Sequence, residues 1–64
     1  MDNAAEEKRI LEFAEMANYH AAINLALSAM NENRRSQNQT GVDHFIGLIK
    51  SIVEKIDKEF GSAS

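Results

Sequence analysis

The apolar positions of this chain change direction once within its first half. Up to Ala17, at about 100° per residue, the apolar residues Ile10, Phe13 and Ala17 cluster on one side of a helical wheel. After it, the apolar residues cluster roughly 170° away on the same wheel; they are Tyr19, Ala22, Ile23, Ala26, Leu27 and Met30. One straight helix would carry apolar stripes on opposite sides of its two halves, whereas a turn lets both stripes face one core. The pattern therefore predicts a turn at Ala17-Asn18.

With that turn, the chain is expected to fold as an all-α three-helix bundle with helices over about 4–16, 19–33 and 41–60. We expect one helical domain, residues 1–61, followed by a frayed tail at 62–64. The turn contains neither Gly nor Pro, and Ala17 is a good helix former. An alternative therefore stays open: residues 4–33 form one long helix, the last helix folds back on it as a two-helix hairpin, and two copies make a four-helix bundle.

Short polar motifs predict where the helices begin and end. Asn3-Ala4-Ala5-Glu6 has the form of a capping box for the first helix. Residues 33–39 contain no apolar side chain, which is typical of a solvated loop. Thr40 is expected to cap the third helix, with Asp43 three residues later, and Gly61 to end it.

The third helix has the clearest apolar face, and two leucines elsewhere lie off theirs. Leu48 widens the third face to an arc of roughly 160°, which suits contact with two helices; the other members are Val42, Phe45, Ile46, Ile49, Ile52, Val53, Ile56 and Phe60. In the second helix, Ala22, Ala26 and Ala29 lack bulk, so a neighbouring helix can approach closely. Leu11 and Leu25 each lie roughly 115° from the centre of the apolar face of their own helix.

Residues 17–30 resemble a known helical motif. Their sequence, Ala-Asn-Tyr-His-Ala-Ala-Ile-Asn-Leu-Ala-Leu-Ser-Ala-Met, looks like the turn and second helix of a tetratricopeptide repeat. Microtubule-interacting-and-trafficking domains, which are three-helix bundles, share much of this pattern. Tyr19, Ala22, Ala26 and Ala29 fall on its packing positions, and Ala17 takes the place of the usual turn glycine. The chain holds one copy, whereas stacked repeats need several; the resemblance implies a helix break and a protein-binding role.

Composition narrows the classes of function. A 64-residue chain builds a small core, and such a core rarely contributes more than about 3–5 kcal/mol to the free energy of unfolding. Association with a partner is therefore one route to stability. The net charge of −3 argues against a general binder of nucleic acid or anionic membranes. No apolar run approaches the ~18–20 residues of a membrane span. The N-terminal residues do not form a signal peptide, so we expect a cytoplasmic protein.

No residue pattern indicates catalysis or ligand chemistry. The chain has no Cys, and its two histidines, His20 and His44, lie outside any Glu-x-x-His or His-x-x-x-His spacing. The three glycines are scattered and form no phosphate-binding loop. We therefore expect no catalytic residue, no cofactor and no metal ion, and a non-enzymatic role.

Two functional hypotheses follow. In the first, the chain is a protein–protein interaction module, such as an adaptor, inhibitor or chaperone-like subunit. Leu11 and Leu25 would then flank an apolar groove for a helix of a partner or of a second copy, with Met16 and Leu48 at its rim. In the second, the homodimeric hairpin binds nucleic acid through Arg34 and Arg35. The acidic balance counts against it, and the two arginines are better explained as a solvated helix end that complements the helix dipole.

Overall fold

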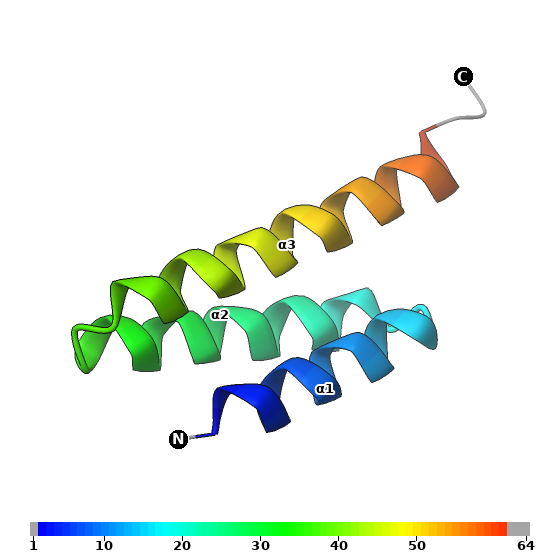
Figure 1. Ribbon diagram of the computed structural model, residues 1–64. Coiled ribbons are helices and arrows are strands. Elements are labelled where there is room, and N and C mark those ends of the chain that lie inside the picture. The colour runs from blue at the N-terminus through cyan, green and yellow to red at the C-terminus, as the bar shows by residue number, and fades with distance from the viewer. Residues whose placement is uncertain (1, 62–64) are drawn as a thin grey trace.

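Three α-helices joined by two short loops make up the fold (Figure 1). The computed structural model describes residues 2–61: α1 (Asn3–Glu15), α2 (Tyr19–Arg35) and α3 (Gln39–Phe60). The all-α three-helix bundle is thus confirmed. The alternative with one helix over residues 4–33 is wrong, because the chain turns at residues 16–18. The predicted fraying of residues 62–64 lies outside the described residues.

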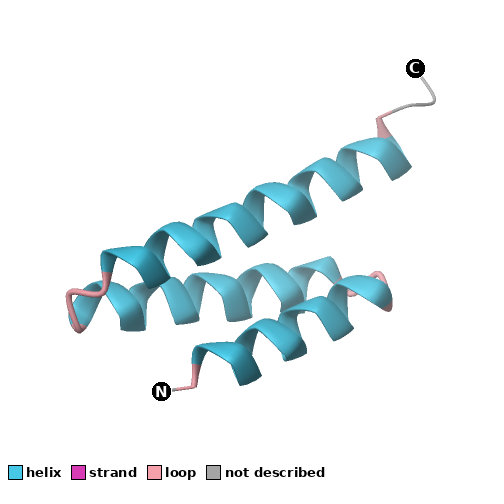
Figure 2. Ribbon diagram, in the orientation of Figure 1, coloured by secondary structure: helices cyan, strands magenta, loops and turns pink. Residues whose placement is uncertain are grey.

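The α1–α2 loop reverses the chain through a left-handed residue that is not glycine (Figure 2). Ala17 has φ 61°, and its N–H donates to the Ala14 carbonyl at 3.0 Å. The Asn18 N–H donates to the Phe13 carbonyl at 2.9 Å, which completes a Schellman motif. The Asn18 side chain then accepts from the Ala21 N–H at 3.3 Å and so caps α2. This turn is the physical cause of the change in apolar direction.

The α2–α3 loop repeats the same geometry twenty residues later. Gln37 has φ 60° and donates its N–H to the Arg34 carbonyl, while the Asn38 N–H donates to the Asn33 carbonyl at 2.8 Å. The Asn38 side chain accepts from the Gly41 N–H at 3.1 Å. The connection is only residues 36–38, because α2 continues to Arg35. The predicted solvated loop over residues 33–39 is therefore too long.

Both predicted N-caps are displaced from the observed ones. Asp2 caps α1, since its carboxylate accepts from the N–H groups of Ala4 and Ala5, so the capping box from Asn3 to Glu6 is wrong. Asn38 rather than Thr40 caps α3. In each case a second good capping residue lies one or two positions earlier, and local sequence alone does not choose between them.

The helices are arranged around α2. Both α1 and α3 run antiparallel to it, so they are parallel to each other, and they contact each other at few positions (Figure 1). Three alanines of α2 face the core and let both neighbours approach closely. The buried cluster is Ile10, Ala14, Ala22, Ala26, Ala29, Phe45 and Ile52.

The buried faces of α2 and α3 are rotated from the predicted ones. On α2 the stripe through Ala22, Ala26 and Ala29 is the centre, so Leu25 packs against the core and Leu27 is 40% exposed. The predictions that Leu25 points outward and Leu27 inward are therefore wrong. On α3 the face turns by roughly 40° towards Phe45 and Ile52. This rotation leaves Val53 51% and Phe60 73% exposed, contrary to prediction. Both rotations arise because α2 lies between two neighbours and α3 has α1 on one side.

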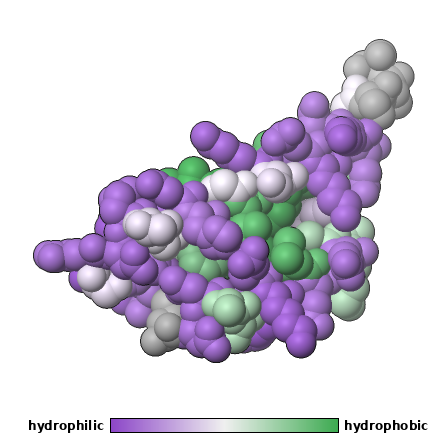
Figure 3. Space-filling model, viewed as in Figure 1, coloured by the Kyte–Doolittle hydropathy of each residue, from purple (hydrophilic) through white to green (hydrophobic). Residues whose placement is uncertain are grey.

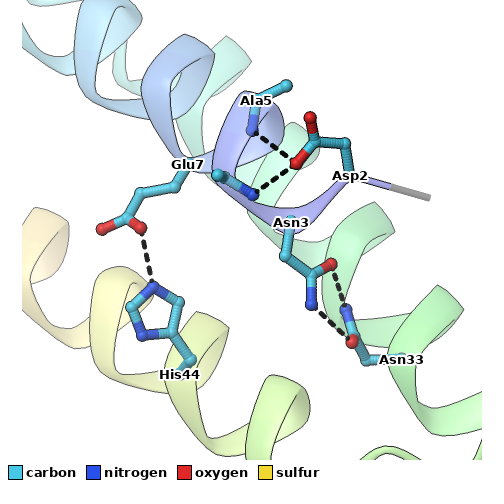
Figure 4. Close-up of polar contacts among 7 residues, drawn as sticks. Asp2, Asn3, Ala5, Glu7, Asn33 and His44 are labelled. Atoms are coloured by element: carbon cyan, nitrogen blue, oxygen red, sulfur yellow. Dashed lines mark hydrogen bonds and ion pairs between the residues drawn. The ribbon is translucent and has the colours of Figure 1, made fainter.

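A cluster of three asparagines around the buried Asn33 links the three helices at one end, and Figure 4 shows its Asn3–Asn33 pair. Asn33 is 3% exposed and exchanges two hydrogen bonds with Asn3, of 2.9 and 3.1 Å. Its Nδ2 also donates to the Ala29 carbonyl, and its Oδ1 accepts from Asn38 Nδ2 at 3.0 Å. Gly41 is needed beside the cluster, because a Cβ there would overlap the Asn33 amide. All donors and acceptors of the buried amide are used, so the cluster fixes how the three helices meet.

Candidate protein-docking groove

An apolar groove lies between the C-terminal half of α1 and the middle of α3. Figure 3 shows apolar surface exposed between these two helices. The groove forms because both helices pack along α2 and contact each other at few positions (Figure 1). Its volume is about 210 Å³, and its lining residues are Leu11, Ala14, Glu15, Leu48, Ser51, Ile52 and Lys55.

Leu11 and Leu48 form the apolar walls of the groove from opposite sides. Leu11 is next to the buried Ile10 but about 100° around α1, on the side that faces α3, and it is 45% exposed. Leu48 is half-buried on the side of α3 that faces α1. Ala14 and Ile52 supply buried apolar surface between them. A pair of leucines over an apolar floor suits the apolar side chains of another helix.

The two walls differ in charge beyond the apolar part. The α1 wall carries Glu15 and the α3 wall carries Lys55, whose Nζ donates to the Ala14 carbonyl at 3.5 Å. A second, more polar depression continues along α3 and is lined by Ser51, Glu54, Lys55 and Lys58. Along this depression the α3 wall carries two lysines, Lys55 and Lys58, and one carboxylate, Glu54.

The structure brings together two of the four residues expected at this site. Leu11 and Leu48 both line the groove. Leu25 instead packs against the core. Met16 is exposed at the C-cap of α1 but is not among the lining residues. The lining residues Ser51, Ile52 and Lys55 follow Leu48 at the i+3, i+4 and i+7 positions, and that spacing is the sequence signal that would have identified them.

The arginines of the nucleic-acid hypothesis lie in the last turn of α2, away from the groove. Arg35 forms an exposed salt bridge with Glu32 at 3.1 Å. The long-helix hairpin on which that hypothesis rests is not the observed fold.

The remaining titratable groups make isolated contacts. His44 Nε2 lies 3.0 Å from the Glu7 carboxylate (Figure 4), and His20 Nε2 lies 3.0 Å from Asn24. The Tyr19 hydroxyl donates to Glu59 at 2.6 Å, and this hydrogen bond, together with burial and the carboxylate charge, raises the pKa of Tyr19 above 10.0. Within residues 2–61 there is no group of three or more His, Cys, Asp or Glu side chains that could hold a metal ion. In the same part of the chain, none of the helices combines the length and apolar composition that crossing a membrane requires.

No protein-family model, curated protein or solved structure matches this chain. The groove is therefore the main structural indication of a function.

Proposed function

We propose that this chain is a non-enzymatic protein–protein interaction module that binds a helix of another protein in the groove between α1 and α3. The observation that carries the proposal is the exposure of Leu11 in a groove that it lines together with Leu48 of α3 and the buried Ala14 and Ile52. Ligand pockets for small molecules usually measure about 300–1,000 Å³ and enclose their ligand. This groove is smaller and open along its length, which favours side chains presented by a helix.

The arrangement of the three helices leaves open the place that a fourth helix would occupy in a four-helix bundle. Since α1 and α3 are parallel and meet at few positions, a helix running antiparallel to both would contact Leu11 on one side and Leu48 on the other. It would complete a four-helix bundle, the usual way in which such helices bury their apolar faces. The resemblance of residues 17–30 to protein-binding helical hairpins points to the same class of function.

The charges of the groove define the chemistry of the partner helix. We expect apolar residues at i, i+3 or i+4, and i+7, which face the two leucines. Acidic residues should flank this stripe on the side that meets Lys55 and Lys58. A basic residue on the other side would meet Glu15.

A display library of amphipathic helical peptides, selected against the purified chain, tests the proposal. We expect enrichment of helices with that apolar stripe and those acidic flanks. Leu11→Lys should weaken their binding by at least about tenfold, because it places a charge in the apolar wall. Leu27→Lys is the matched control, since Leu27 is also a half-exposed helical leucine but lies outside the groove.

Circular dichroism melting curves should show that both variants remain folded. Lys55→Glu should shift the selected flanks from acidic to basic. Peptides that bind Leu11→Lys as tightly as the original chain, or the absence of any enriched apolar stripe, would contradict the proposal.

A further inference from the structure

We propose that α3 also pairs two copies of this chain, antiparallel, through a surface separate from the groove. The feature that points to it is a seven-residue repeat in α3. One row of the repeat is Ile46, Val53 and Phe60, which we call the outer row. The other is Val42, Ile49 and Ile56, which we call the inner row. The two rows alternate at spacings of three and four residues, as the core positions of a coiled coil do.

The inner row packs against the core within one molecule, whereas the outer row is covered only in part, at Ile46. Val42 is buried, and Ile49 and Ile56 pack against the core. The outer row becomes more exposed along the helix, from the half-buried Ile46 to Val53 and Phe60, which are respectively one-half and about three-quarters exposed. A row of large apolar side chains on one helix edge marks an interaction surface better than scattered ones do.

The outer row does not belong to the groove. Leu48, the groove residue of α3, lies roughly 140–160° around the helix from Ile46 and Val53. One molecule could therefore bind a partner helix at the groove and a second copy at the outer row at the same time.

A row of alternating charges follows the outer row at the same seven-residue spacing. Asp43, Lys50 and Asp57 each precede an outer-row residue by three positions, which places them about 60° around the helix from it. Neither Lys50 nor Asp57 takes part in an ion pair within residues 2–61. The pattern of acid, base and acid is what selects a second copy as the occupant.

Antiparallel and parallel pairing of two outer rows bring different charged residues together. Antiparallel pairing centred at Val53 places Lys50 of each copy against Asp57 of the other, and Ile46 against Phe60. The two Lys50–Asp57 contacts are related by the twofold axis, as in any isologous dimer. Parallel pairing instead puts Lys50 level with Lys50 and Asp57 level with Asp57. The charge row is thus complementary to itself in one orientation only.

The interface should be modest and reversible. From Ile46 to Phe60 the row spans about 21 Å of helix at 1.5 Å per residue, which makes one short seam. Stable interfaces usually bury about 800 Å² on each partner, more than one short seam provides. We therefore expect a dimer that dissociates on dilution.

Sedimentation velocity over a concentration series from ~10 µM to ~1 mM tests the pairing. The original chain should pass from monomer to dimer within that range. Val53→Glu should remain monomeric throughout, because the twofold axis brings its two carboxylates together. Val53 is half exposed in one molecule, so the substitution should leave the circular dichroism spectrum unchanged.

A charge exchange tests the orientation. Lys50→Asp and Asp57→Lys should each raise the dissociation constant of the dimer by about tenfold, since each turns two attractive contacts into repulsive ones. The double variant should return it to within about twofold of the original value. Leu11→Lys should leave the dimer unchanged, because Leu11 lies in the groove.

Any of these results would overturn the proposal: a chain that is monomeric at every concentration, a dimer that tolerates Val53→Glu, or a double charge variant that pairs no better than the single ones. If Leu11→Lys abolishes the dimer, the second copy occupies the groove instead, and the outer row is not the interface. The outcome of the peptide selection does not affect this test, since the two surfaces are separate.

Discussion

Two glycines six residues apart in α3 have opposite surroundings. A Cβ added at Gly41 would overlap the Asn33 side chain and lie 2.9 Å from Asn38 Nδ2. A Cβ added at Gly47 would meet nothing within 4 Å. Glycine inside a helix destabilises it by about 0.5–1 kcal/mol relative to alanine, since it loses more backbone freedom on folding. Gly41 is required by the asparagine cluster, whereas no atom of the described fold requires Gly47.

Alanine at the two positions should therefore change stability in opposite directions. Gly47→Ala should raise the free energy of unfolding by about 0.5–1 kcal/mol. Gly41→Ala should lower it by about 1–3 kcal/mol, because it overpacks a site whose polar groups are all engaged. Urea titrations at a dilution where the chain is monomeric give both values. Equal shifts of the same sign would show that Asn33 moves aside without loss.

Much of each helix follows from its sequence, but the ends and the exact face do not. The turn at Ala17 was predictable, because a Schellman motif rotates the chain and so shifts the phase of the apolar residues. The N-cap residues were not predictable, because each helix start offers two good candidates. Asp2 and Asn3 are both suited to cap α1, and Asn38 and Thr40 are both suited to cap α3. Asn33 was placed in a solvated loop because it lies among polar residues. Its burial depends on Asn3, thirty positions away, and no local signal carries that information.

Substitutions at two neighbouring residues of α3 should change stability by different amounts and so show which way its buried face points. Ile52 is buried and Val53 half exposed, although both belong to the apolar face expected from the sequence. Ile52→Ala should lower the free energy of unfolding by about 2–5 kcal/mol, a large part of the stability of so small a domain. Val53→Ala should lower it by less than about 1 kcal/mol in the monomer. Comparable losses measured by urea denaturation would place the centre of the face nearer to Val53.

The contact between the start of α2 and the end of α3 should be visible in a pH titration. The hydrogen bond to Glu59 raises the pKa of Tyr19, so the neutral phenol is favoured in the folded state. Its contribution to stability is present below about pH 10 and is lost as the pH rises through the folded pKa. Tyr19 is the only tyrosine and the chain has no Trp, so absorbance reports this group alone. Glu59→Ala should return the midpoint towards 10.0, and an unchanged midpoint would contradict the contact.

At the scale of the whole molecule, the groove was only partly predictable. Leu11 and Leu48 could be found, because the first lies off its own apolar face and the second widens the arc of α3. Leu25 could not be assigned correctly from one helix, because a central helix with neighbours on two sides buries a wider arc than its wheel indicates. Which leucines share a groove depends on how α1 and α3 flank α2, and that is a property of the assembled bundle.

The asparagine cluster holds one end of the bundle, whereas the C-terminal half of α3 is held by hydrogen bonds from Tyr19 to Glu59 and from Lys55 to Ala14. The cluster ties the helices together with uncharged amides at one end, while α3 diverges from α2 towards its C-terminus (Figure 1). Lys55 lies about 21 Å along α3 from Gly41, so a tilt of about 10° around the tied end would move it by roughly 4 Å. Widening the groove in this way would leave the amide contacts in place but would have to displace the hydrogen bonds of Lys55 to Ala14 and of Tyr19 to Glu59.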